Sequence, residues 1–299
     1  MIDLLSLEGI TVFDKLLNYY RIYADLSKKH HITSPDILPV EPQRGQTCKL
    51  KALADAMGHT SFKYKQPLKF LYKERTYPHS LRELAKKHGS VVGEVYCIEM
   101  LHKICADAGF ESKVYEPFNE DAYILQLQEL IDNNLAPIVF FDMDLSDERR
   151  GLPYIGDGKN EHASVVVGYY KNQCDETRFI VTQWNCYYDF DGMELALSTR
   201  HSLKEQRKPE TFCKTYNETI AQTEWRLDSE INAPEISLLV GTPKRTALAM
   251  HDTDTALKGK IFVLTQPRPI LGSAQSGFFP QQPKEKNMEE ALQLPSMYL

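Results

Sequence analysis

The sequence predicts an α+β protein in which helices come first along the chain and an antiparallel sheet follows. Apolar residues recur mostly at helical spacing up to residue 134, with one short strand among them. From Pro137 onward, short apolar β runs replace this pattern. A chain that groups its helices before its strands in this way is typical of the α+β class. We therefore expect an N-terminal helical part that packs on a C-terminal antiparallel sheet.

Five helices are predicted from apolar spacing and from helix start and stop residues. They cover residues 8–29, 47–57, 80–88, 91–109 and 121–134. Leu50, Leu53 and Met57 share one face of the second helix, and Gly58 is expected to end it. The buried stripe predicted for the fourth helix comprises Val95, Ile98, Leu101 and Ile104 or Cys105.

Strands are predicted where four to eight apolar or β-branched residues follow one another. They cover residues 111–115, 137–142, 163–170 and 179–183, with shorter candidates at 236–240 and 260–265. Residues 198–232 are polar and match neither period, and the segment from Gln266 onward has the composition of a loose tail. We predict one domain over residues 1–265, with a core at 40–190, additions at 1–39 and 191–265, and a tail at 266–299.

The charge of the chain excludes one broad class of partner. Asp and Glu number 41 against 35 Lys and Arg, so the net charge is −6. A broad nucleic-acid surface would need a basic excess, so no nucleic-acid partner is expected. No apolar run approaches the roughly 20 residues that span a bilayer, so no membrane partner is expected either.

The six cysteines predict neither a metal site nor a disulfide framework. None forms a CxxC pair, and no HExxH motif occurs, so we expect no cofactor and no metal. The acidic pairs Asp142/Asp144 and Asp189/Asp191 are interpreted as solvated loop acids. The N-terminus lacks the basic and small-residue features of a secretory signal. Reduced thiols in a cytosol are therefore expected.

Cys48 is the candidate nucleophile because it opens a predicted helix. Unpaired backbone N–H groups and the positive end of the helix dipole favour thiolate there. Lys49 and Lys51 add positive charge nearby. The Cys48 N–H and the side-chain amide of Gln43, five residues upstream, are the candidate donors to an oxyanion. The alternative is that Cys48 is a small buried residue of an ordinary helix.

His162 is the candidate base because it stands at the entry to the apolar run Ala163–Tyr170. A strand that buries itself holds the histidine at its end in a fixed place, as a general base requires. The preceding loop contains Gly151, Gly156 and Gly158 and could border a cleft. The alternative is a surface histidine that merely precedes a core strand.

The run Phe179–Asn185 supplies the candidate orienting group. If this strand pairs with the His162 strand, its end lies beside His162, where an amide carbonyl can accept the imidazole Nδ1–H. Gln183 and Asn185 both qualify because they point to the same face. Gln183 is preferred because it ends the strand, with Asn185 as the alternative orienter. Trp184 is expected either to shield the pair or to pack in the core.

These motifs together resemble the papain-like superfamily of cysteine enzymes. The run QRGQTCKLKAL resembles the Gln-x-Gly-x-x-Cys variant of C39-like and actin-maturation-type proteases. The runs EHASVVVGYY and FIVTQWN resemble the strands that carry the histidine and its orienter. The Cys-Gly-Ser-Cys-Trp signature of papain is missing, and Lys49 stands where C39-like members often have glycine. A Cys-His-Gln triad also resembles bacterial effector deamidases of the cycle-inhibiting-factor type and related transglutaminases.

The resemblance implies a papain-like fold and a cysteine peptidase that cleaves amide bonds of a protein or peptide through a Cys48 acyl-enzyme. One alternative is an effector that deamidates or transglutaminates glutamine with the same triad, which would imply export by a non-classical route into a host cytosol. Another is a non-catalytic protein-binding module on the same fold.

Overall fold

In the computed structural model, the described residues all lie within the first of two units, Met1–Arg268 and Pro269–Leu299. They are residues 2–3, 24–25, 27–32, 47–64, 80–184, 186–203, 210–217, 222–227, 244–247 and 256–267. The predicted strand at 236–240, the predicted tail beyond residue 267 and most of the predicted helix at 8–29 lie outside these residues.

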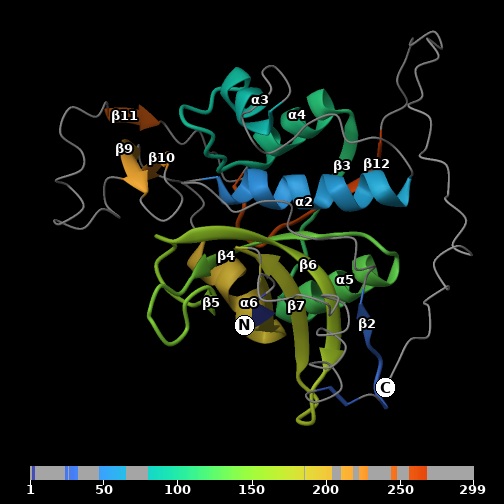
Figure 1. The fold of residues 1–299 in the computed structure, drawn as a ribbon. Helices are drawn as coiled ribbons and strands as arrows, with labels where there is room; N and C mark the ends of the chain where they lie inside the picture. Colours follow the sequence, from blue (N-terminus) through green and yellow to red (C-terminus); the bar gives the residue numbers. More distant parts are fainter. Residues whose placement is uncertain are drawn as a thin grey trace, which may run out of the picture. The chain divides into compact units, whose positions relative to one another are not determined.

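A nine-stranded antiparallel sheet is the centre of the described structure (Figure 1). Its main order is β1-β8-β7-β6-β4-β12-β3, with β2 paired to β6 and β5 paired to β4. The strands are β1 (Ile2–Asp3), β2 (His31–Ile32), β3 (Phe110–Tyr115), β4 (Ile138–Met143), β5 (Pro153–Tyr154), β6 (Glu161–Lys171), β7 (Thr177–Gln183), β8 (Cys186–Asp191) and β12 (Ile261–Pro267). A separate three-stranded sheet contains β9 (Glu210–Asn217), β10 (Gln222–Leu227) and β11 (Lys244–Ala247).

The helices cover both faces of the main sheet. They are α2 (Cys48–Lys63), α3 (Leu81–Lys87), α4 (Ile98–Ala108), α5 (Glu120–Asp132) and α6 (Gly192–Leu197), which continues into the π-helical turn η1 (Ser198–Ser202). Figure 1 shows α2 between the sheet and the pair α3 and α4. The α+β class is confirmed, and the helix that starts at Cys48 packs on the antiparallel sheet as expected.

Alternating side chains of β4 divide the core into two clusters. Ile138 and Phe140 join residues of α2, α3 and α4 in what we call the α2-side core. Val139 and Phe141 join residues of α5 and α6 in the α5-side core. Successive residues of a strand point to opposite faces, so this division follows from the period of two.

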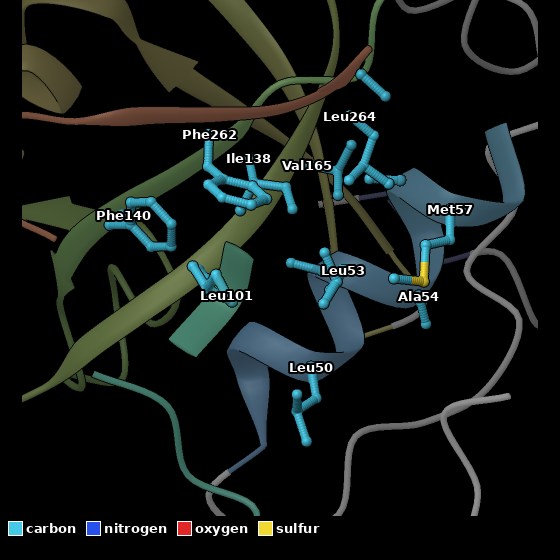
Figure 2. Packing of buried hydrophobic residues seen from close by; sticks show 14 of the residues in the cluster. Leu50, Leu53, Ala54, Met57, Leu101, Ile138, Phe140, Val165, Phe262 and Leu264 are labelled. Carbon is cyan, nitrogen blue, oxygen red and sulfur yellow. The ribbon is translucent and has the colours of Figure 1, made fainter. Parts of the chain in front are cut away.

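The apolar face of α2 holds the helix on the sheet. Leu50, Leu53 and Met57 are fully buried, as their helical spacing predicts. Figure 2 shows them in the α2-side core with Val165 of β6 and Phe262 of β12. Burying a leucine side chain stabilises the fold by roughly 1.5–3 kcal/mol, so this face determines where the helix lies.

Gly58 does not end α2, which was the expectation. The helix continues to Lys63, and His59, Thr60 and Ser61 are buried within it. A glycine inside a helix costs only about 1 kcal/mol relative to alanine. The burial of the following turn offsets that cost, so packing overrides the local stop signal.

Two other predicted helices begin or end elsewhere. Ala24, inside the predicted helix at 8–29, forms an antiparallel bridge with Asn172 instead. The predicted helix at 91–109 begins only at Ile98, because the Glu94 carboxylate accepts hydrogen bonds from the backbone N–H groups of Val91 and Val92. Such local side-chain bonds give the backbone an alternative to the helix.

The region after Gln183 contains structure that the sequence did not reveal. Asp189 and Asp191, interpreted as loop acids, lie on β8, where Arg178 pairs with both carboxylates. The polar segment 198–232 includes η1, β9 and β10. Both assignments depend on pairing with strands elsewhere in the chain, which no local period reports.

Leu53→Ala should test whether α2 is held by its apolar face. Leu53 is fully buried, so we expect the free energy of unfolding to fall by about 2–5 kcal/mol in denaturant titration. Leu125→Ala removes an exposed leucine from α5 and should change it by less than about 0.5 kcal/mol. Equal effects of the two substitutions would contradict the packing described here.

Candidate active site

Cys48 is the first residue of α2 and lies against the start of β6. The residue is 5% exposed, and Sγ is 4.0 Å from the backbone carbonyl oxygen of Glu161. A thiol is a weak donor, and this distance is at the outer limit for a hydrogen bond to sulfur. The packing of α2 thus brings Cys48 next to the residue that precedes His162, although the two segments are far apart in sequence.

His162 is the second residue of β6, and its side chain is buried among aromatic rings. Its ring centroid is 5.6 Å from that of Phe141 and 5.4 Å from that of Trp184. Phe141 belongs to the α5-side core, whereas α2 packs in the α2-side core. Among the described contacts, the hydrogen bond of the Cys48 thiol goes to the Glu161 carbonyl and none joins it to the imidazole.

The surroundings of His162 favour a neutral imidazole. Burial, and secondarily the charge of Lys49, lower its pKa from 6.5 to about 3. Both causes act against the protonated form. At pH 7 the ring is therefore uncharged.

Gln183 ends β7, and both ends of its side-chain amide are engaged. Its Oε1 accepts a hydrogen bond from the Ser164 hydroxyl at 2.9 Å, and its Nε2 donates to the carbonyl of Gly151 at 2.6 Å. The predicted bond with His162 is not among these contacts. A carbonyl oxygen accepts two hydrogen bonds, so the orienting role of Gln183 stays a prediction.

Gly151 lies where a larger residue would displace this amide. Its φ is +93°, and a Cβ there would lie 2.8 Å from Gln183 Nε2 and 3.0 Å from the ring of Trp184. Glycine adopts this conformation without steric cost. The loop glycine noted in the sequence therefore permits close packing against Gln183.

Two of the predicted site residues cannot be placed. Gln43, the candidate oxyanion donor, and Asn185, the alternative orienter, lie outside the described residues. Their roles stay predictions. Trp184, between Gln183 and Asn185, has a φ of +48°, and its ring lies beside the imidazole and packs against the α5-side core.

The two lysines near Cys48 do not add uncompensated charge, contrary to expectation. Lys49 Nζ lies 2.8 Å from the Glu161 carboxylate and 3.1 Å from the Glu161 carbonyl oxygen. Lys51 Nζ lies 2.5 Å from the Asp55 carboxylate, one turn along α2. Each positive charge is thus paired with a buried carboxylate.

Glu161 is a site residue that the sequence analysis missed. Its side chain is on the α2 side of β6, as the period of two requires for the neighbour of His162. The ammonium group of Lys49 also lies 4.8 Å from the centroid of the Tyr96 ring. The sequence signal was an acidic residue directly before His162 in the run NEHASV. Its pairing with Lys49 on α2 could not be predicted from local spacing.

Asp142 fixes the loop that leads into His162 and is not a solvated loop acid. It is buried on β4, and its carboxylate accepts hydrogen bonds from the backbone N–H groups of Gly158 and Asn160 at 2.8 and 2.9 Å. A buried carboxylate needs such donors. The loop that the sequence placed beside a cleft is thereby attached to the sheet.

Neither a metal cluster nor a membrane helix is found in the part of the chain that the structure describes. No three His, Cys, Asp or Glu side chains there are grouped so as to hold a metal ion. All six cysteines are free thiols. No described helix is both long and apolar enough to cross a bilayer.

Comparison with known proteins gives a distant structural likeness only. No family model and no curated protein matches the sequence. A solved structure, of a putative C39-like peptidase from Bacillus anthracis, is 10% identical with a TM-score of 0.31. The match covers 81% of this chain and 100% of that one. A likeness at this level assigns neither a family nor an activity, and the fold class rests on the helices and strands themselves.

The burial of neutral His162 predicts a loss of stability in acid. The ring binds a proton below about pH 6.5 in the unfolded chain but only near pH 3 in the folded chain, so the free energy of unfolding falls as pH drops through this window. Between pH 7 and pH 4 this residue should contribute a loss of about 3 kcal/mol. His162→Gln should lose that much less than the wild type in denaturant titrations at the two pH values. Equal losses would contradict the burial of a neutral imidazole.

Proposed function

We propose that this chain is a cysteine hydrolase that acts on amide bonds of a protein or peptide, with Cys48 as nucleophile and His162 as base. The observation that supports it is the position of the Cys48 sulfur. The sulfur lies at the N-terminus of a buried helix, 4.0 Å from the backbone of the residue preceding a buried histidine. Cys48 is the first residue of this 16-residue helix, so the sulfur lies at the end where the helix dipole is positive.

In the proposed reaction, neutral His162 accepts the thiol proton and the thiolate attacks the amide carbonyl carbon. The Cys48 N–H and the Gln43 side-chain amide donate to the resulting oxyanion. The intermediate then expels the amine, which takes the proton from His162, and leaves a thioester. Water, deprotonated by His162, attacks the thioester and releases the acid and the free thiol.

The imidazole packs with Phe141 on the α5 side of β6, whereas α2 with the thiol lies on the other side, so this transfer requires the ring to turn toward α2. Hydrogen bonds between catalytic groups are often long before substrate binds. A thiolate forming beside the ring would supply the opposite charge that raises the pKa of His162.

Cleavage and glutamine deamidation would both proceed through an acyl-enzyme at Cys48. They differ in the amide group that Cys48 attacks. The intact mass of a modified target separates them. Two fragments indicate cleavage, and a gain of about 1 Da indicates deamidation. A protein-binding module without activity would give neither product and no labelling of Cys48.

Cys48→Ala should abolish both activity and labelling by a peptide-based electrophile, because it removes the proposed nucleophile. Its melting temperature should stay close to that of the wild type, because a small side chain replaces a small one. Labelled residues are identified by peptide mass spectrometry. Cys174→Ala removes an exposed thiol outside the site and should keep both signals. Preferential labelling of Cys174 in the wild type would contradict the proposal.

Gln183→Ala should lower the rate of the reaction more than Asn185→Ala does, because Gln183 ends β7 beside Ser164 and Gly151. Removing it leaves the Gly151 carbonyl and the Ser164 hydroxyl without their present partner. Rates at saturating substrate provide the comparison, with melting temperatures as the control for folding. A larger loss for Asn185→Ala would reassign the orienting role to Asn185.

A further inference from the structure

A buried ion pair connects the two segments that carry the proposed catalytic residues. Lys49 directly follows Cys48 on α2, and Glu161 directly precedes His162 on β6. Lys49 Nζ contacts the Glu161 carboxylate at 2.8 Å and the Glu161 carbonyl at 3.1 Å. The Cys48 sulfur lies 4.0 Å from the same carbonyl oxygen. One backbone carbonyl therefore meets both the thiol and the neighbouring ammonium group.

The environment of this pair makes its geometry well defined. The side chains of Lys49 and Glu161 are 5% and 3% exposed, and the ring of Tyr96 lies under the ammonium group. Two charges withdrawn from water attract each other strongly. Separating them would leave each charge buried without its partner, which is costly. A buried pair is weak evidence for added stability but can specify one arrangement of the elements it joins.

We infer that the Lys49–Glu161 ion pair is a positioning device that sets the placement of the Cys48 thiol relative to the His162 end of β6. Lys49 and Glu161 are thus positioning residues that act through their chain neighbours. The inference rests on the proposed function, because it concerns how the nucleophile and base of that reaction are aligned. A misplacement of reacting groups by about 1 Å costs up to about 100-fold in rate.

Lys49 also acts on His162 in a way that a purely structural contact would not. The charge of Lys49 is the second cause, after burial, of the lowered pKa of His162. Removing that charge should raise the midpoint of the His162 titration. This gives a readout that does not depend on substrate or on turnover.

The test compares Lys49→Met/Glu161→Gln, which neutralises both partners and keeps similar side-chain lengths, with the wild type. We expect labelling of Cys48 by the peptide-based electrophile to slow by about 10-fold to 100-fold. We also expect the NMR titration of the His162 ring to move to higher pH. Circular dichroism and the melting temperature report whether the variant is folded.

The same helix offers a matched control. Lys51 and Asp55 form a second buried ion pair, with side chains 7% and 3% exposed, that does not involve Glu161. Lys51→Met/Asp55→Asn should leave the rate of Cys48 labelling within about twofold of the wild type. A comparable slowing in this control would mean that any buried pair on α2 has the same effect, and would overturn the inference.

Glu161→Asp separates geometry from charge and covers the case in which the neutral variant does not fold. It keeps both charges but shortens the acid by one methylene, so the 2.8 Å contact is lost unless α2 moves. We expect slower Cys48 labelling with little change in the His162 titration. An unchanged labelling rate in Glu161→Asp and in any folded neutral variant would overturn the inference and leave the proposed function intact. Absence of Cys48 labelling in the wild type would instead refute the proposed function.

Discussion

Burial of α2 between the sheet and the α3–α4 pair determines where the proposed nucleophile lies. Leu50 and Leu53 are fully buried in the α2-side core with Val165 of β6. Since Cys48 is only two residues before Leu50, this packing leaves the sulfur little choice of position. It places the sulfur against the Glu161 carbonyl, where β6 begins. The helix dipole, the ion pair at Lys49 and the approach to His162 all depend on that placement.

In the same region, two lysine side chains of α2 are paired and His162 is neutral. Lys49 and Lys51 are each compensated by a buried carboxylate, so α2 brings little net charge to the sheet from these positions. His162 avoids the cost of burying a charge by remaining unprotonated. A low-dielectric setting of this kind strengthens the electrostatic interactions of any charge that develops during a reaction. It also makes an unpaired buried charge costly, which fits the pairing of Glu161 with Lys49 and of Asp55 with Lys51.

The second half of the site is built by hydrogen bonds rather than by ion pairs. Gln183 ties β6 to the loop at Gly151, and Asp142 ties the end of the same loop to β4. Gln183 of β7 and Asp142 of β4 thereby fix the loop that precedes His162 at two points. The Gln183 amide is engaged by Ser164 and Gly151, and the imidazole lies between aromatic rings, so the triad stays a prediction.

The sequence by itself determined the α+β class, the helix that begins at Cys48, the apolar strand after His162 and the strand that ends at Gln183. These follow from periods of 3.6 and 2 within short windows, which local side-chain chemistry sets. Only the tertiary structure decided that α2 continues through Gly58, that β8 completes the sheet, and that β12 lies between β4 and β3. The pairing of Lys49 with Glu161 and the aromatic setting of His162 were likewise decided there. These features join residues distant in the chain, and their energies come from burial and long-range pairing, which no window of neighbouring residues contains.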